Sequence, residues 1–203
     1  MIARPQPPVF SAELLLRAYT QGWFPMVHDD GEHYWHDPDP RAVFDLHTLR
    51  PDRTTRRLWR SGRFRCTVDR AFTDVVRGCA APAPGREGTW ISDEMIAAYS
   101  ALHAEGHALS VETWADKRLV GGIYGVRLGA AFFGESMFSR ASGASRVAFH
   151  HLVRLLQTSS FTLFDTQYVN AHTALLGAVE IPRHEFRRRL AAALSLRPTL
   201  VHP

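Results

Sequence analysis

The chain has 203 residues, of which 45% are hydrophobic, and carries a formal net charge of +4. This hydrophobic content is enough for one core and excludes a wholly disordered chain. No apolar stretch reaches the roughly 18 residues of a membrane helix, the first residues lack a signal-peptide pattern, and the two cysteines do not form a C-x-x-C pair. We therefore expect a cytoplasmic protein without membrane contact, disulfide framework or cofactor.

The first predicted helix covers about residues 11–21, because Ser11 is a typical N-cap and Gly22 a typical stop. The segment that follows, residues 23–40, is rich in proline, aspartate and aromatic residues, which predicts loops and short strands. We assign this part of the chain to a small N-terminal domain, residues 1–60, and the remainder, residues 61–203, to a larger catalytic domain.

An arginine-rich run crosses this predicted boundary, with only Asp52 and Asp69 as opposing charges. Its members are Arg50, Arg53, Arg56, Arg57, Arg60, Arg63, Arg65 and Arg70. Such a run predicts contact with nucleic-acid phosphates. A solvated face in an arginine-biased chain is the alternative, since Lys117 is the only lysine of the sequence.

The rest of the chain alternates predicted helices and strands. Helices are expected over about residues 69–79, 92–106, 144–155 and 182–193. Strand-like runs cover residues 107–114, 119–126, 130–138 and 161–164. The first three strands predict an antiparallel meander, and the helix between the last two strands indicates a crossover back into the same sheet.

Polar residues lie at the ends of two of these strands. Asp165 and Gln167 follow an apolar run, and alternation along a strand should turn both side chains to the same side. Glu135 lies near the end of another apolar strand, but it has the opposite parity to Phe132. A β-bulge at or near Gly134 would let both residues serve one site. The pattern predicts a polar reaction centre beside an apolar pocket.

Other candidate sites match no recognised chemistry. Histidines and acidic residues crowd residues 28–39 without the spacing of a metal site, and the sequence at residues 103–107 is not a zinc-protease motif. Neither Cys66 nor Cys79 has a recognisable base partner, and no serine lies in a G-x-S-x-G motif. We expect neither a metal nor a covalent nucleophile.

Seven short motifs follow one another in a fixed order between about residues 14 and 186. They are YTQGWFP (19–25), DPDPR (37–41), TWI (89–91), GGIYGV (121–126), GESMF (134–138), DTQ (165–167) and LGAVEIPR (176–183). Together they resemble the leucyl/phenylalanyl-tRNA–protein transferase family. The resemblance implies transfer of Leu or Phe, with Met as a further donor, from aminoacyl-tRNA to the N-terminal Arg or Lys of a protein, which marks that protein for degradation.

The resemblance also implies a fold: an α+β, N-acetyltransferase-like mixed sheet with flanking helices, plus a small N-terminal α/β domain. The implied catalytic pair is Asp165 and Gln167, with Glu135 and Asn170 close to the acceptor and aminoacyl groups. Trp35 and Trp90 stand where aromatic residues meet the 3′-terminal adenosine. The implied aminoacyl pocket is Ile123, Phe132, Phe149, Leu152 and Phe164, for which core packing is the alternative by residue type alone. Contacts to the tRNA backbone are assigned to Arg53, Arg56, Arg57, Arg60, Arg63 and Arg65.

Two positions depart from the family pattern. Members often carry a second aromatic residue where His36 stands and a cysteine where Phe133 stands. The first departure bears on how adenosine is stacked, and the second on the dimensions of the pocket.

The reaction demands positioning more than a strong base. The aminoacyl ester is already activated, and an α-amine with a pKa of about 7.7 to 8.0 is partly neutral at cellular pH. We expect Asp165 to orient Gln167, whose carbonyl accepts a hydrogen bond from the amine, or to take the proton itself. Glu135 would select a cationic acceptor side chain, unless it forms an ordinary ion pair at the strand end.

Two other functions stay open on the residues alone. An acyl-CoA-dependent N-acetyltransferase is one, because the Ser-Gly-Ala sequence at residues 142–144 precedes a helix and could hold a pyrophosphate. A non-catalytic RNA-binding module built on the arginine-rich run is the other. The second alternative would leave Asp165, Gln167 and Glu135 without a role.

Overall fold

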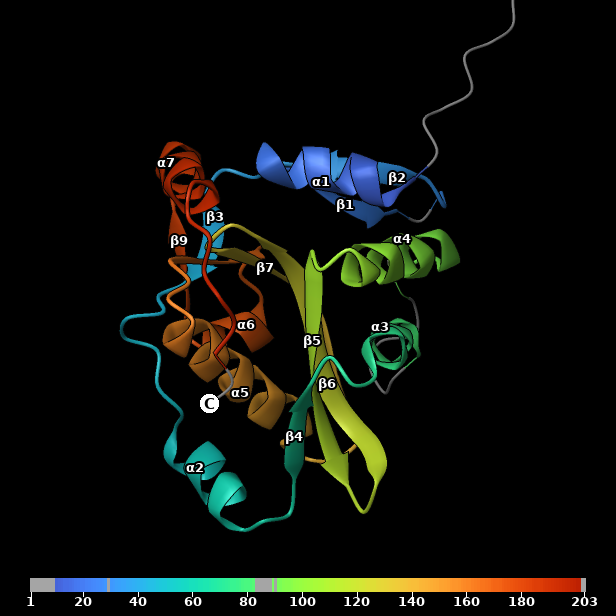
Figure 1. The fold of residues 1–203 in the computed structure, drawn as a ribbon, viewed down its shortest axis with the longest axis vertical. Helices are drawn as coiled ribbons and strands as arrows, with labels where there is room; N and C mark the ends of the chain where they lie inside the picture. Colours follow the sequence, from blue (N-terminus) through green and yellow to red (C-terminus); the bar gives the residue numbers. More distant parts are fainter. Residues whose placement is uncertain (1–9, 29, 83–88, 90, 202–203) are drawn as a thin grey trace, which may run out of the picture.

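The computed structural model describes residues 10–28, 30–82, 89 and 91–201, and Figure 1 labels its elements. The helices are α1 (Ala12–Thr20), α2 (Arg53–Arg60), α3 (Phe72–Ala80), α4 (Asp93–Ala104), α5 (Ala144–Thr158), α6 (Ala171–Leu175) and α7 (Arg183–Leu194). The strands are β1 (Phe24–Val27), β2 (His33–His36), β3 (Arg41–Phe44), β4 (Arg65–Val68), β5 (Ala108–Ala115), β6 (Arg118–Leu128), β7 (Ala131–Ser139), β8 (Leu163–Gln167) and β9 (Ala178–Ile181). Trp90, expected to contact adenosine, lies outside the described residues.

Seven strands form one mixed sheet in the order β4-β5-β6-β7-β8-β3-β9, and β1 and β2 pair in a separate hairpin. β7 and β8 are parallel, whereas the other neighbours in the sheet are antiparallel. The predicted meander is β5-β6-β7, and α5 is the crossover between the two parallel strands. The sheet and its flanking helices confirm the coarse prediction of an α+β fold.

Helices cover both faces of the sheet. Figure 1 shows α3 and α4 on one side and α5 on the other. Two apolar clusters correspond to these layers: one includes residues of α1, α3 and α4, and the other includes the buried stripe of α5. Glu135 on β7, and Asp165 and Gln167 on β8, lie in the middle of the sheet, between these two layers.

Local signals account for the helix starts. The side chain of Ser11 accepts a hydrogen bond from the backbone N–H of Leu14 at 3.2 Å, and Ser92 accepts one from Met95 at 3.2 Å. Such caps satisfy backbone donors that have no partner inside the first helical turn. The predicted starts of α1 and α4 are confirmed.

The segment predicted as loops and short strands, residues 23–40, contains β1 and β2, and β3 follows it directly. β3 does not remain with the hairpin, because it lies between β8 and β9 in the large sheet. The arginine-rich run contains α2, whose one buried residue is Thr55. With so few apolar residues, the helix has no periodic stripe by which the sequence could reveal it. A domain boundary near Arg60 stays a prediction.

Candidate active site

A β-bulge brings Glu135 to the site. The ladder between β6 and β7 includes Gly134 and Ser136 but skips the residue between them. Gly134 is required here, since a Cβ at this position would lie 2.8 Å from the ring of Phe164. The extra residue shifts the alternation of side chains, so that Phe132 is buried in the core while Glu135 lines a cavity. The predicted bulge is confirmed.

The cavity beside Glu135 has a volume of about 270 Å³. Its apolar wall includes Phe24, Pro25, Met26, Phe44, Ile123, Met137 and Phe164. Its polar wall includes Glu135, Ser136, Thr166, Gln167, Tyr168, Asn170, His172 and Thr173. Five residues that the sequence assigned to the site therefore meet here: Ile123, Glu135, Phe164, Gln167 and Asn170.

Other residues assigned to the pocket lie behind its wall. Phe132, Phe149 and Leu152 are fully buried in the cluster that packs under α5. The ring of Phe132 meets that of the wall residue Phe164 edge-on, with centroids 5.3 Å apart. Trp35, on β2, packs against the other apolar cluster. Phe132, Phe149 and Leu152 thus support the cavity wall from behind, whereas Trp35 is half-buried on β2 and is not among the residues that line the cavity.

Asp165 is held by a buried arginine. Arg41 Nε lies 2.8 Å from Asp165 Oδ1, and Arg41 Nη2 lies 2.6 Å from Oδ2. Both side chains are buried, and Arg41 Nη1 donates to the carbonyl of Gly22 at 2.8 Å. The guanidinium lies between the rings of Phe24 and Phe186, 4.7 and 4.3 Å from their centroids. With both carboxylate oxygens bound to Arg41, the geometry favours an orienting role for Asp165 over direct proton transfer.

Gln167 connects Asp165 to the cavity. Its backbone has the left-handed φ of 62°, which costs a residue other than glycine about 1 to 3 kcal/mol. The backbone N–H donates to Asp165 Oδ1 at 3.1 Å, and the side-chain Nε2 donates to Glu135 Oε1 at 3.3 Å. Because Nε2 is engaged, the carbonyl Oε1 is the end of the amide left to accept a hydrogen bond.

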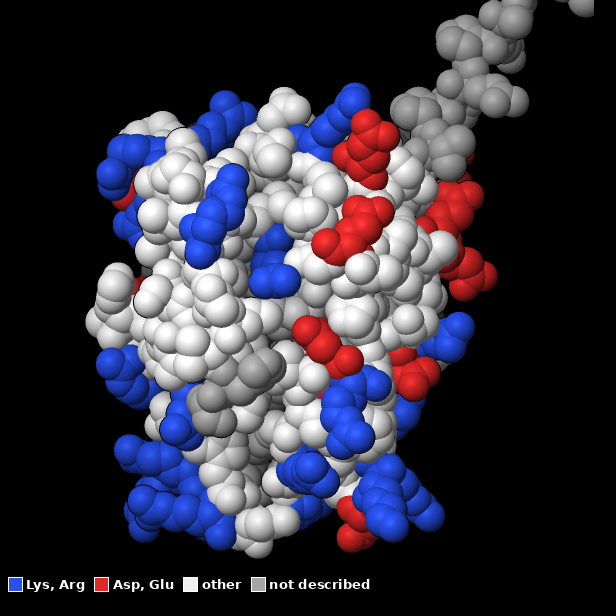
Figure 2. Space-filling view, viewed as in Figure 1, with Lys and Arg blue, Asp and Glu red and all other residues white. Residues whose placement is uncertain are grey.

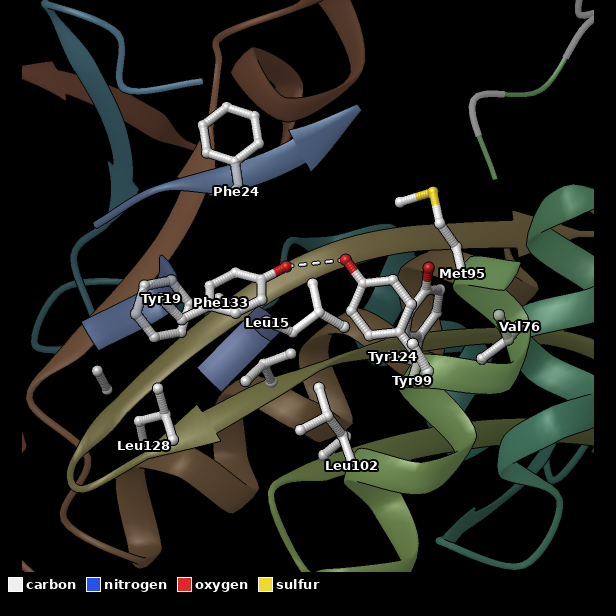
Figure 3. Packing of buried hydrophobic residues seen from close by; sticks show 14 of the residues in the cluster. Leu15, Tyr19, Phe24, Val76, Met95, Tyr99, Leu102, Tyr124, Leu128 and Phe133 are labelled. Atoms are coloured by element: carbon white, nitrogen blue, oxygen red, sulfur yellow. Dashed lines mark hydrogen bonds between the residues drawn. The ribbon is translucent and has the colours of Figure 1, made fainter. Parts of the chain in front are cut away.

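Glu135 has neutral hydrogen-bond donors. Its Oε2 accepts from the hydroxyl of Tyr99 at 2.9 Å. The Tyr99 hydroxyl lies 2.8 Å from that of Tyr19, and Figure 3 draws this hydrogen bond. Burial raises the pKa of Glu135 to about 7. Near neutral pH this carboxyl group is therefore divided between its protonated and ionised forms.

Asn170 lines the cavity while it caps α6. Its Oδ1 accepts from the backbone N–H groups of His172 and Thr173, each at 2.9 Å. This fixes the loop after β8, and Nδ2 is the end of the amide that can donate to a ligand.

An aromatic rim adjoins the cavity. The hydroxyl of Tyr168 lies 2.9 Å from His36 Nδ1, and the His36 ring stacks on Phe24 with centroids 5.5 Å apart. Burial lowers the pKa of His36. Sequence reasoning missed Tyr168, although it directly follows the DTQ motif, and missed Arg41, although it ends the DPDPR motif.

The arginines assigned to the tRNA backbone lie on α2, on the loop after it and on β4. All are exposed: Arg53, Arg56, Arg57, Arg60, Arg63 and Arg65. Among the described residues, none of them forms an ion pair with a carboxylate. Their charges are therefore available to a polyanion.

Within the described ranges, no group of three or more His, Cys, Asp or Glu residues could hold a metal ion. No helix in the same part of the chain is both long and apolar enough to cross a bilayer. Cys66 and Cys79 form no disulfide with each other, and burial raises the pKa of the Cys66 thiol to about 11. Near neutral pH this thiol is protonated, which is unfavourable for a nucleophile.

Comparison with known proteins gives one consistent result. Residues 43–191 match the family model described as leucyl/phenylalanyl-tRNA protein transferase, and residues 9–39 match the model of its N-terminal domain. The leucyl/phenylalanyl-tRNA–protein transferase of Gloeobacter violaceus is 51% identical over 185 residues, which are 91% of this chain and 94% of that protein. The protein of the same name from Pelodictyon phaeoclathratiforme is 52% identical over 181 residues, 89% of this chain and 93% of that protein.

A third relative with this name, from Jannaschia sp., is 48% identical over 195 residues, 95% of this chain and 90% of that protein. Among solved structures, L-PGS from Bacillus licheniformis is similar with a TM-score of 0.45 and 16% identity, covering 75% of this chain and 56% of that chain. A likeness of this size does not support an assignment of fold.

Proposed function

Because the chain belongs to the leucyl/phenylalanyl-tRNA–protein transferase family, we propose that its cavity holds the side chain of the donor amino acid and that Gln167 and Glu135 align the acceptor amine. The protein is an aminoacyltransferase that uses aminoacyl-tRNA as donor and a protein as acceptor. The two alternatives, an acyl-CoA-dependent N-acetyltransferase and a non-catalytic RNA-binding module, are not favoured.

The donors proposed are Leu, Phe and Met. The apolar wall of the cavity, which includes Ile123, Phe44 and Phe164, supports this because a charged side chain would lose its hydration there. An apolar wall separates side chains that differ by one methylene only weakly. Selection among the three donors should therefore be broad.

The acceptors proposed are proteins with N-terminal Arg or Lys, which the reaction marks for degradation. Glu135 supports this, because its ionised form would attract a cationic side chain or ammonium group. The larger part of the chain is proposed to have an N-acetyltransferase-like fold. The parallel β7-β8 pair, joined through α5, supports that proposal.

Peptide-bond formation requires one proton to move. The amine nitrogen bonds to the ester carbonyl carbon, the bond from that carbon to the ribose oxygen breaks, and the proton leaving nitrogen ends on the ribose oxygen. The pKa of Glu135, about 7, is close to the value of about 7.7 to 8.0 for an α-amine. Such a match suits Glu135 to carry this proton.

Asp165 acts as a positioning residue in this proposal. Arg41 fixes its carboxylate from one side, and Asp165 Oδ1 holds the backbone N–H of Gln167 at 3.1 Å from the other. The hydrogen bond between Gln167 Nε2 and Glu135 Oε1, at 3.3 Å on the cavity wall, is the single observation that carries the mechanism. It directs the amide carbonyl of Gln167 toward the amine to be aligned.

The test compares Gln167→Ala with the parent protein, using labelled leucyl-tRNA and an acceptor protein that begins with Arg. We expect transfer to fall about 100-fold or more, as when one aligned hydrogen-bonding group is removed from an active site, while leucyl-tRNA binding changes less than about threefold. The matched control is Gln21→Ala, which removes an exposed amide at the end of α1. Full transfer by Gln167→Ala, or label transfer from an acyl-CoA, would refute the proposal.

A further inference from the structure

A second groove lies at the β4 edge of the sheet and shares no residue with the catalytic cavity. Its volume is about 530 Å³. It is lined by Gly62, Arg63, Arg65, Thr67, Arg70, Trp114, Asp116 and Lys117. The loop after α2, the edge strand β4 and the turn between β5 and β6 thus meet around one hollow.

Trp114 is fixed in the wall of this groove. Its Nε1 donates to Thr67 Oγ1 at 2.7 Å, and that hydroxyl donates to Oε2 of the buried Glu112 at 2.5 Å. Arg65 is the register partner of Trp114 across β4 and β5, which places both side chains on one face. Since the indole N–H is already satisfied and the residue is half-buried, Trp114 offers a rigid aromatic surface rather than a hydrogen bond.

The charge of the groove is strongly positive. Four cations line it, Arg63, Arg65, Arg70 and Lys117, against one acidic residue, Asp116. All four are exposed, and among the described residues none forms an ion pair. Figure 2 shows lysine and arginine gathered at this end of the molecule, over α2 and the lower end of the sheet in that view.

The arginines of α7 differ from the cations around the groove, because they have acidic partners. Arg187 is ion-paired with Asp37, and Arg188 and Arg189 both contact Glu185 Oε1 at 2.7 Å. An arginine-biased composition would supply exposed guanidinium groups at both ends of the molecule. It does not explain why acidic partners accompany the arginines of α7 and not the four cations around the groove.

We propose that this groove binds a nucleotide unit in the body of the tRNA, away from the aminoacylated end, with its phosphate among the four cations and its base or ribose against Trp114. The proposal rests on the proposed function, in which tRNA is the donor. An aromatic surface between cations fits a nucleotide better than an acidic peptide, which would leave Trp114 without a partner. The exposed arginines of α2 continue the cationic surface beyond the groove.

The kinetic test compares a complete donor with a minimal one. In the double variant Arg70→Ala/Lys117→Ala, and separately in Trp114→Leu, we expect KM for phenylalanyl-tRNA to rise about tenfold with kcat unchanged. Kinetics with phenylalanyl-adenosine, which has no tRNA body, should not change. The salt dependence of tRNA binding should fall by about two in log–log slope for the double variant, one for each phosphate contact removed.

The matched control is Arg188→Ala/Arg189→Ala, which removes the same charge from α7 and should leave KM for phenylalanyl-tRNA within twofold. An equal loss with both donors would indicate a structural effect and overturn the groove proposal, as would an unchanged KM. Failure of the proposed function has a different signature, namely full transfer by Gln167→Ala with either donor.

A second measurement uses Lys117, the only lysine in the sequence. Acetylation of its amine by an amine-reactive ester can be followed on a single peptide by mass spectrometry in the unaltered protein. Saturating phenylalanyl-tRNA should slow this acetylation at least fivefold, whereas phenylalanyl-adenosine should leave the rate unchanged. Equal rates with and without tRNA would overturn the proposal, and so would equally strong protection by polyglutamate of the same total charge.

Discussion

Glu135 lines the cavity, whereas Asp165 is fully buried and does not face it as expected, and the two carboxylates have opposite surroundings. Asp165, on β8, has a bidentate cationic partner in Arg41. Glu135, on the bulge of β7, accepts hydrogen bonds from the neutral groups of Tyr99 and Gln167. A carboxylate fixed by a buried arginine is suited to hold a structure in place, whereas one with neutral partners is suited to exchange a proton or bind an incoming cation. The acid of the DTQ motif and the acid of the GESMF motif thus have separable functions.

The largest effect should come from breaking the fixed pair. Arg41→Met leaves Asp165 as an unpaired buried charge, and we expect the free energy of unfolding to fall by about 3 to 5 kcal/mol, measured by urea denaturation. The double variant Arg41→Met/Asp165→Leu should recover part of this loss, since Asp165 no longer leaves an unpaired charge and the buried side chain of Asp37 keeps Arg183 and Arg187 as partners.

A surface pair provides the control for this change. Arg188→Met removes an exposed partner of Glu185 and should alter the free energy of unfolding by less than about 1 kcal/mol. Equal stability of Arg41→Met and Arg188→Met would mean that the buried pair does not fix β8.

A smaller effect is expected from removing the titratable group at the bulge. Glu135→Gln preserves an acceptor for Tyr99 but cannot carry a proton. We expect kcat to fall about 100-fold at pH 8. In the parent, activity should rise with pH through about 7, the pKa of Glu135, whereas the variant should keep only the rise at about 7.7 to 8.0 that comes from the acceptor amine. Exposed Glu94→Gln is the control; an unchanged pH profile in Glu135→Gln would assign the proton transfer elsewhere.

The smallest effect is on stability as a function of pH. Burial raises the pKa of Glu135 from 4.5 to about 7, so the folded protein binds more protons than the unfolded chain between these values. The stabilisation from protonated Glu135 is full below pH 4.5 and is lost as pH rises through 7. Glu135→Gln should therefore gain stability relative to the parent between pH 5 and 8, by about 2 to 3 kcal/mol or roughly 4 to 12 °C in Tm. Calorimetric scans that show a constant difference would contradict the raised pKa.

Sequence reasoning succeeded where the signal was local. The starts of α1 and α4 follow from Ser11 and Ser92, whose side chains can cap only the helix that begins beside them. The bulge at Gly134 follows from the opposite parity of Phe132 and Glu135, because one extra residue is the simplest way to bring both side chains to the same face of a strand.

Sequence reasoning was less successful where two interacting residues are far apart in the chain. Arg41 and Asp165 are separated by 124 positions, and an arginine is rarely fully buried, so composition gives no reason to place it in the core. Phe132 and Phe149 have the residue type of a pocket wall, but whether an apolar residue lines a cavity or packs behind it depends on the packing of α5 on the sheet. Residue type does not distinguish these two positions.

The position of β3 has a consequence for synthesis on the ribosome. Residues 41–44 leave the ribosome early, yet both neighbouring strands, β8 and β9, come from residues 163–181. Until residues 163–181 have emerged, β3 has no strand to pair with and Arg41 lacks its partner Asp165. The nascent protein therefore cannot begin to modify other polypeptides before these residues have been translated.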